Sequence, residues 1–188
     1  MNNKKTFRFY IALWVAKSVS FILKLTGRNA TSLPGKIAIR ICPDFLGRLE
    51  KPKTIIGVTG TNGKTTVCNI INDILTANKF DFINNKYGSN IDRGVATTLI
   101  QGSTMLGKAK KDLAVLEIDE RSTRKIFPYV TPTYLVCTNI FRDSLMRHAH
   151  TEFISGILST YIPKETIMIE NADDLISSQI AENNKKIY

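Results

Sequence analysis

From residue 53 onwards, runs of β-branched and apolar residues alternate with segments of helical periodicity, and this alternation is what most constrains the fold. The strongest runs are TIIGVT at 54–59, LAVLEI at 113–118, TYLVCT at 133–138 and TIMIE at 166–170. Uninterrupted runs of this kind are typical of strands that are buried on both faces of a sheet. We therefore predict an α/β fold in which a mostly parallel sheet is flanked by helices.

The segments between these runs predict helices and one further short strand. The expected helices are 64–78, 94–101, 122–127, 151–160 and 172–181, and the expected short strand is 80–84. A chain of 188 residues, of which 43% are hydrophobic, is long enough to bury a core, and its composition excludes a disordered protein.

The loop between the first strand and the helix that follows it carries the clearest chemical signal. Residues 57–66 read GVTGTNGKTT and stand between a strand and a helix, the context of a phosphate-binding loop. In the strict pattern G-x-x-x-x-G-K-[ST] the first glycine would fall at Val58, so this chain departs from the pattern by one position. Gly60 and Gly63 still allow backbone N–H groups to approach an anion, and the helix N-terminus adds partial positive charge.

Two side chains at the end of this loop suit a nucleotide with its metal ion. Lys64 can reach the terminal phosphates, and the hydroxyl of Thr65 can bind Mg²⁺. A glycine-rich turn before an ordinary helix is the alternative interpretation, which the sequence context and the GKT ending disfavour.

Polar residues follow two of the other predicted strands. Glu117 and Asp119 stand at the end of 113–118, and either could face Mg²⁺ if that strand neighbours the loop strand. Asn139 and Asp143 follow 133–138, where the ligand crevice of a parallel sheet is expected. A solvated acidic turn and a capped loop are the respective alternatives.

Residues 6–26 predict an amphipathic helix that ends at Gly27. Its apolar stripe consists of Phe7, Ile11, Trp14, Val15, Ser18, Phe21, Ile22 and Leu25. The longest uncharged run, Phe9–Ala16, is much shorter than the roughly 20 residues that span a bilayer. The helix either packs on its own domain or lies on an anionic membrane surface, and the sequence leaves both open.

The positive charge is concentrated near the N-terminus. The net charge is +10, with 11 Lys and Arg against 2 Asp and Glu in residues 1–53, and 15 against 14 in residues 54–188. A nucleic-acid-binding domain would carry its charge on the folded body, so we expect no nucleic-acid partner. We divide the chain into a basic N-terminal helix with a connector, 1–53, and a nucleotide-binding domain, 54–188.

The three cysteines, Cys42, Cys68 and Cys137, lie far apart and form no CxxC pair. This spacing argues against a zinc cluster or a disulfide framework and is typical of a protein in the reducing cytoplasm.

Together these motifs resemble the Mur ligase family. TGTNGKTT at 59–66 is similar to the ATP loop of Mur ligases and folylpolyglutamate synthases. The further motifs resemble the MurT branch of the family, in the order expected there. They are LPG at 33–35, NKYGSN at 85–90 with Arg93-Gly94, LEIDE at 116–120, TNIFRD at 138–143 and NADD at 171–174. The resemblance covers most of residues 30–182.

The resemblance implies an ATP-dependent amide ligase. Such enzymes use MgATP to convert a carboxylate into an acyl phosphate, which a nitrogen nucleophile then attacks. In the MurT branch the carboxylate is the α-carboxyl of D-glutamate in lipid II. The nucleophile is ammonia from a glutamine amidotransferase partner of the GatD type. The implied location is the cytoplasm, at the inner face of the plasma membrane.

The resemblance also implies roles for individual residues. Lys64 and Glu117 would act in catalysis, and Thr65 and Glu117 would bind Mg²⁺. The nucleotide would be bound by Gly60, Thr61, Asn62, Gly63, Lys64, Thr65, Thr66, Asn139 and Asp143.

Two departures from the family bear on the function. Many Mur ligases carry a metal-binding histidine at the position of Ser144, so we expect no second metal site here. The family continues into a zinc insertion and a C-terminal domain, which we expect to be absent from this chain, leaving little turnover by the chain alone. The alternatives are a fragment of another Mur-type or folylpolyglutamate-type ligase, and a non-catalytic nucleotide-binding module.

Overall fold

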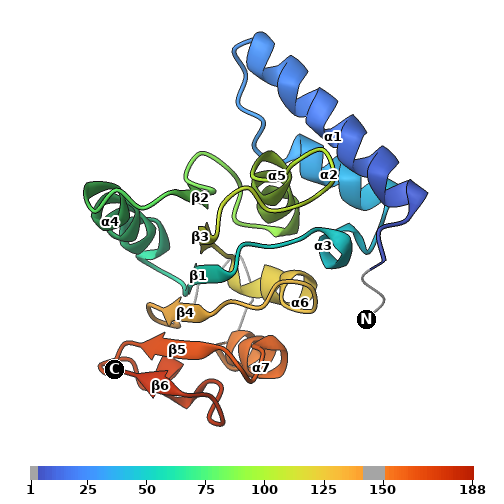
Figure 1. Ribbon diagram of the computed structural model, residues 1–188. Coiled ribbons are helices and arrows are strands. Elements are labelled where there is room, and N and C mark those ends of the chain that lie inside the picture. Colours follow the sequence, from blue (N-terminus) through green and yellow to red (C-terminus); the bar gives the residue numbers. More distant parts are fainter. Residues whose placement is uncertain (1–3, 142–150) are drawn as a thin grey trace.

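The computed structural model describes residues 4–141 and 151–188, and a six-stranded parallel sheet forms its centre (Figure 1). The strands are β1 (Thr54–Thr59), β2 (Phe82–Asn84), β3 (Leu113–Glu117), β4 (Tyr134–Cys137), β5 (Ile167–Glu170) and β6 (Lys186–Ile187). Their order is β2-β3-β1-β4-β5-β6, and each pairing between neighbours is parallel. The predicted fold class is confirmed.

Helices lie on both faces of this sheet (Figure 1). The α-helices are α1 (Phe7–Leu25), α2 (Leu33–Ile41), α3 (Phe45–Arg48), α4 (Lys64–Ala77), α5 (Asp92–Gln101), α6 (Thr123–Ile126) and α7 (Thr151–Tyr161). There are also two short 3₁₀ helices in the described residues, η1 (Glu120–Ser122) and η3 (Ser177–Gln179). Helix α4 covers one face of the sheet and α5, α6 and α7 cover the other.

The strand order decides which loops meet. Strand β1 lies between β3 and β4, with Val58 level with Glu117 of β3 and with Val136 of β4. All three strands point the same way, so the segments that follow them gather at one edge of the sheet. Ligands of open α/β sheets bind at this carboxyl edge.

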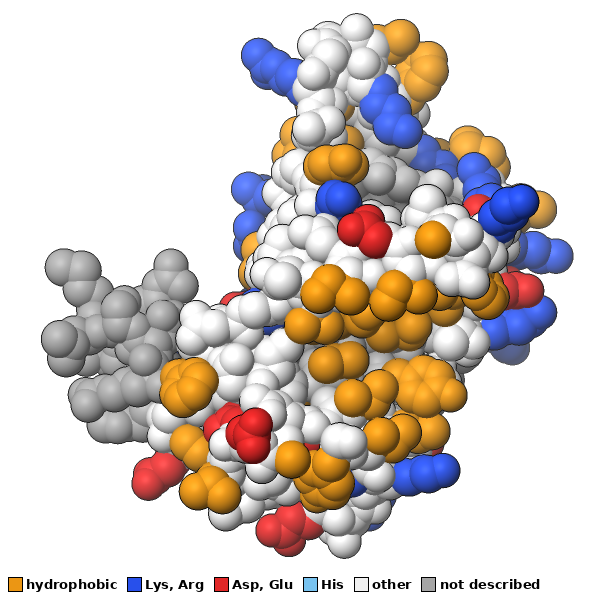
Figure 2. Space-filling view, turned by 90° about the vertical axis from the view of Figure 1, so that its left-hand side faces the viewer, with side chains coloured by type: hydrophobic (Ala, Val, Ile, Leu, Met, Phe, Trp, Pro, Cys, Tyr) orange, Lys and Arg blue, Asp and Glu red, His pale blue; other side chains and the backbone are white. Residues whose placement is uncertain are grey.

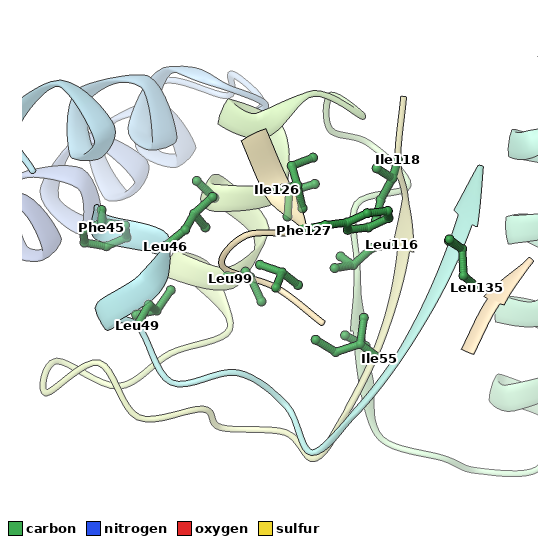
Figure 3. Packing of buried hydrophobic residues seen from close by; sticks show 14 of the residues in the cluster. Phe45, Leu46, Leu49, Ile55, Leu99, Leu116, Ile118, Ile126, Phe127 and Leu135 are labelled. Atoms are coloured by element: carbon green, nitrogen blue, oxygen red, sulfur yellow. The ribbon is translucent and has the colours of Figure 1, made fainter. Parts of the chain in front are cut away.

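The larger core cluster joins the N-terminal helices to the sheet. Figure 3 shows Phe45 and Leu46 of α3 in one cluster with Leu99 of α5 and Leu116 of β3. Because these side chains bury apolar surface together, the N-terminal helices are part of the same packed body as the sheet.

The core under α4 is smaller. Its buried members are Val58, Cys68 and Val115, and hydrophobic side chains remain visible along the α4 side in Figure 2. The side chains of Ile70 and Ile74 of α4 are both more than half exposed.

Helix α1 packs through a different face from its predicted apolar stripe. The buried residues are Phe9, Ala12, Leu13, Ala16 and Ser20, whereas seven of the eight stripe residues are exposed large hydrophobics. The small buried residues permit close packing on α2 and α5, and the rings of Phe9 and Phe45 stack at 5.1 Å between centroids. Of the two alternatives left open by the sequence, the structure shows that α1 packs on the rest of the chain through this face.

The predicted end of this helix is also confirmed. Helix α1 ends at Leu25, and Gly27 follows with a φ of +69°, a conformation that favours glycine. Among the described residues, none of the helices has the length and apolar character that crossing a bilayer requires.

The segment expected to be a connector contains two helices, α2 and α3. Pro34 stands in the first turn of α2, where its missing N–H costs no hydrogen bond. At Gly35 an added Cβ would lie 2.0 Å from the carbonyl oxygen of Arg93, so α2 and α5 are in close backbone contact. The sequence prediction missed these helices because each is too short for a clear periodicity.

The helix predicted at 172–181 is wrong, since only η3 forms there. The carboxylate of Asp174 accepts hydrogen bonds from the backbone N–H groups of Ile140, Ile176 and Ser177. Ala181 adopts a φ of +50°, which ends any right-handed helix. Side-chain capping therefore replaces a helical hydrogen-bond pattern in this segment.

Candidate functional site

The loop between β1 and α4 contains two glycines with positive φ values. Gly60 and Gly63 have φ values of +123° and +81°, which residues with a Cβ rarely adopt. An added Cβ at Gly60 would lie 2.2 Å from Thr138 Oγ1. No side chain caps the N-terminus of α4. The N–H groups of its first turn therefore have no side-chain acceptor, which suits binding of a phosphate.

The ammonium group of Lys64 points back into this loop. Its Nζ donates to the carbonyl oxygen of Gly60 and, at 3.2 Å, to that of Thr61. It also lies 3.4 Å from Glu120 Oε1, and the two side chains are only 13% and 11% exposed. These contacts hold the ammonium group of Lys64 beside the loop where phosphates are expected.

Burial raises the pKa of the Glu120 carboxyl, and the Asp119 carboxylate raises it further, while the Lys64 ammonium opposes the shift. A buried carboxylate of this kind needs its cationic partner, because an unpaired charge in the protein interior is costly. Sequence analysis did not select Glu120. The only signal was its place in the LEIDE segment after a buried strand.

Thr65 and Glu117 form the second polar pair of the site. Thr65 Oγ1 donates to Glu117 Oε2 at 2.9 Å, and Asn90 Nδ2 donates to Glu117 Oε1 at 3.1 Å. Asn85 exchanges two hydrogen bonds with the Glu117 backbone, at 2.8 and 2.9 Å. The carboxylate is thus fixed next to the hydroxyl at the start of α4.

Asp119, the alternative to Glu117, faces elsewhere. Its Oδ2 accepts hydrogen bonds from the backbone N–H and the hydroxyl of Ser122, so it caps η1. The sequence could not separate the two acids, because only the strand direction and the cap decide which carboxylate faces Thr65.

The segment that follows β4 forms hydrogen bonds with the loop between β1 and α4. Asn139 Oδ1 accepts from the backbone N–H of Asn62 at 3.0 Å, and the Asn139 carbonyl oxygen accepts from the Thr61 N–H at 2.8 Å. Thr138 Oγ1 donates to the Asn62 carbonyl oxygen at 2.7 Å. Asn139 therefore lies at the carboxyl edge of the sheet, and its contacts are with the loop itself.

The carboxylate of Asp174 accepts a hydrogen bond from the segment that follows β4. Its Oδ2 lies 2.7 Å from the N–H of Ile140, which immediately follows Asn139. Asp143 and Ser144, which the sequence analysis also selected, lie outside the described residues. Thr66 is exposed in the first turn of α4.

Together these residues place a lysine ammonium, backbone N–H groups and the side-chain oxygens of Thr65 and Glu117 at one edge of the sheet. Mg²⁺ prefers oxygen ligands and keeps several waters, so the Thr65 hydroxyl and the Glu117 carboxylate are a chemically suitable pair. Within 4–141 and 151–188, no three His, Cys, Asp or Glu side chains cluster as a metal site. The nucleotide-binding and metal-binding roles of these residues stay predictions.

Comparison with known sequences places this site in a family context. Residues 58–188 match the family described as the Mur ligase middle domain. The chain is 35% identical over 175 residues to the MurT subunit of lipid II isoglutaminyl synthase (glutamine-hydrolyzing) from Staphylococcus aureus strain COL. That alignment covers 92% of this chain and 39% of the relative.

A second relative is the subunit of the same name from Streptococcus pneumoniae strain R6. It is 40% identical over 147 residues, which cover 78% of this chain and 31% of that protein. The chain thus spans less than half the length of either relative.

Solved structures share the fold at low sequence identity. MurF ligase from Thermotoga maritima in complex with ADP has a TM-score of 0.60 and 20% identity, covering 82% of this chain and 36% of that one. FolC from E. coli in complex with DHPP and ADP has a TM-score of 0.56 and 17% identity, covering 75% and 43%. These likenesses concern the fold alone.

Proposed function

The chain belongs to the Mur ligase family, and we propose that it is the MgATP-binding part of a MurT-type amide ligase of peptidoglycan synthesis. The observation that carries the proposal is the site at the carboxyl edge of the sheet. There an uncapped helix N-terminus, the Lys64 ammonium and the Thr65–Glu117 pair surround one loop. The MurT relatives, 35% and 40% identical, support the choice of branch.

The proposed reaction has two steps. A carboxylate oxygen of the D-glutamate residue in lipid II attacks the γ-phosphorus of ATP, ADP leaves, and an acyl phosphate forms. Ammonia then attacks the acyl carbon, phosphate leaves, a proton is lost, and the amide remains. Lys64 and the N–H groups of the loop would offset the charge that develops on the phosphoryl oxygens.

Thr65 and Glu117 would hold the magnesium ion that accompanies the nucleotide. When bound, this ion neutralises phosphate charge and polarises the phosphoryl group. Asn90 would keep the Glu117 carboxylate oriented, and Asn139 and Thr138 would keep the loop open for the phosphates. For Asp143 we propose a place in the nucleotide crevice on the family resemblance alone.

We propose that a separate glutamine amidotransferase subunit of the GatD type supplies the ammonia. The names of both MurT relatives describe one subunit of a glutamine-hydrolyzing enzyme. In this chain, Cys42, Cys68 and Cys137 are all buried, and burial raises their pKa values to about 11, 12 and 12. Because a nucleophilic cysteine must be a thiolate, none of them suits glutamine hydrolysis.

With lipid II as its substrate, the proposed reaction would take place in the cytoplasm, at the inner face of the plasma membrane. The free cysteines agree with a reducing compartment. The relatives are more than twice as long as the aligned segment, so the remaining parts of such an enzyme are expected to contribute to turnover.

Calorimetric titration with ATP and Mg²⁺ tests the first element of the proposal. We expect Lys64→Ala to weaken nucleotide binding at least tenfold, since a charge-assisted contact contributes on the order of 1.4 kcal/mol or more. Lys164→Ala is the matched control, because Lys164 is an exposed lysine away from the loop, and it should bind like the wild type. Equal affinities of Lys64→Ala and Lys164→Ala for the nucleotide would contradict the proposed nucleotide site.

An assay of ADP release tests the reaction. In this assay ammonium chloride replaces glutamine and the partner subunit as the source of ammonia. Sustained ADP release should require lipid II and ammonium together, because the first step alone releases at most one ADP per site. Lipid II whose glutamate is already amidated should give no ADP. Because the chain alone is expected to turn over little, the assay is repeated with the partner subunit and the remaining parts of the enzyme added. MgATP binding without ADP release even then would favour the non-catalytic module. Release with another carboxylate substrate instead would favour a different ligase of the family.

A further inference from the structure

The outward side of α1 carries an apolar surface that the fold leaves uncovered. We call it the α1 apolar face; it consists of Phe7, Ile11, Trp14, Val15, Phe21, Ile22 and Leu25, extended by Met105 and Leu106. Each of these side chains is exposed, and those of Phe21 and Leu25 are 63% and 71% exposed. Exposed apolar surface in this concentration marks an interaction site.

The two parts of the face are held together by hydrogen bonds. Trp14 Nε1 donates to the Met105 carbonyl oxygen at 3.0 Å, and Lys5 Nζ donates to that of Leu106 at 3.0 Å. On the opposite side of α1, Phe9 and Leu13 are fully buried. The helix is therefore anchored, and its 19 residues present a strip about 28 Å long to the outside.

The segments that build the face carry basic residues and no acidic ones. Residues 1–43 contain eight Lys and Arg and no Asp or Glu, and 102–111 contain three Lys and no acid. At the upper end of the molecule in Figure 2, where the C-terminal half of α1 lies, hydrophobic side chains stand beside Lys and Arg. Lys17 is not free to contact headgroups: its Nζ donates to the carbonyl oxygens of Ile100 and Ser103 at 2.7 Å, and burial, with a smaller effect of Lys110, lowers its pKa to about 8.

From this combination we infer that the α1 apolar face is a docking surface for an anionic lipid bilayer. Apolar side chains would enter the boundary between headgroups and acyl chains, while cations of these segments contact the headgroup phosphates. Trp14 suits this boundary, because its indole has an apolar body and a polar N–H. The helix would lie flat on the surface.

A second copy of the chain fits this face less well. Pairing two α1 apolar faces would bring two sets of cations together without acidic groups from these segments to balance them. An anionic bilayer offers the opposite charge together with an apolar layer, so it matches both properties of the face.

Vesicle flotation with the full chain tests the inference. The vesicles contain phosphatidylglycerol and phosphatidylcholine but neither lipid II nor nucleotide, so the result does not depend on the proposed reaction. We expect co-flotation with these vesicles, much weaker flotation with pure phosphatidylcholine, and weakening by 0.5 M salt because screening shortens the reach of the charges.

Two double variants test whether vesicle binding depends on the α1 apolar face or on exposed hydrophobic residues in general. Phe21→Ser with Leu25→Ser should reduce flotation at least tenfold. Ile70→Ser with Ile74→Ser on α4 is the matched control, since these side chains are 54% and 56% exposed, and it should float like the wild type. All four side chains are exposed, so both variants should keep the wild-type melting temperature. Equal loss in both double variants would overturn the inference.

Fluorescence gives an independent readout, because Trp14 is the single tryptophan of the sequence. Its emission should shift to the blue on addition of anionic vesicles, and brominated lipid should quench it. An unchanged spectrum would overturn the inference. A dimer in sedimentation that Phe21→Ser with Leu25→Ser converts to a monomer, without vesicle binding by the wild type, would overturn it in favour of self-association.

Discussion

The ammonium of Lys64 lies 3.4 Å from the carboxylate of Glu120, and both side chains are almost entirely buried beside the loop. The pair joins the first residue of α4 to η1, which follows β3. Besides the loop carbonyls of Gly60 and Thr61, this carboxylate is the contact that holds the lysine in the loop. The pair therefore links the stability of the fold to the geometry of the candidate site.

Replacing Glu120 should change how stability depends on pH. Burial raises the pKa of this carboxyl, so the folded protein binds more protons than the unfolded chain between the unfolded and the folded pKa. The contribution of Glu120 to stability is complete below the unfolded pKa and is lost as pH rises through the folded pKa. Glu120→Gln removes this titration, so its melting temperature relative to wild type should increase with pH.

Thermal melts of both proteins from pH 4 to pH 8 measure this difference. The amide oxygen of Gln can still accept from Lys64, so the variant is expected to fold. A difference in melting temperature that is constant across this range would contradict the raised pKa.

Glu117→Gln should weaken magnesium-assisted nucleotide binding. The substitution removes the negative charge next to the Thr65 hydroxyl but keeps an oxygen for its hydrogen bond. We expect a loss on the order of tenfold in affinity for ATP with Mg²⁺, and little change for ATP with EDTA. Asp119→Asn, which keeps an oxygen to cap η1, is the control and should bind normally. Weaker binding of ATP with Mg²⁺ by Asp119→Asn, with normal binding by Glu117→Gln, would assign the metal to Asp119.

Gly60→Ala should destabilise the fold. A methyl group at this position would lie 2.2 Å from Thr138 Oγ1, and the φ of +123° is unfavourable for alanine. We expect the free energy of unfolding to fall by about 2–3 kcal/mol. Gly156→Ala in α7 has open space around the added Cβ and should raise it by about 0.5–1 kcal/mol. Urea denaturation of both variants measures the two effects, and similar values would contradict the steric argument.

Asp174→Ala should destabilise the chain through the segment after β4. The change leaves the N–H groups of Ile140, Ile176 and Ser177 without their acceptor, at an expected cost of about 2–4 kcal/mol. Asp173→Ala alters an exposed neighbour and should stay within about 0.5 kcal/mol of wild type. Differential scanning calorimetry compares them, and equal melting temperatures would show that Asp174 is not a structural cap.

Local signals in the sequence determined the order of the main strands and helices and the position of the glycine loop. Apolar runs at 54–59, 113–118 and 133–138 predict buried strands because burial on both faces requires a continuous apolar side-chain set. Gly60 and Gly63 mark the turn because glycine is the residue that readily adopts the positive φ values such a loop needs. These properties depend on neighbouring residues and can be read along the chain.

The tertiary structure alone decided which residues meet. Glu117 faces Thr65 because β3 neighbours β1, whereas Asp119, two residues later, caps η1. Glu120 reaches Lys64 by the same strand order. Periodicity in α1 identified an apolar stripe but not its environment. Which side of a helix is buried depends on the shape of its neighbours, and here small residues and Phe9 pack closest, which leaves the large apolar face outside.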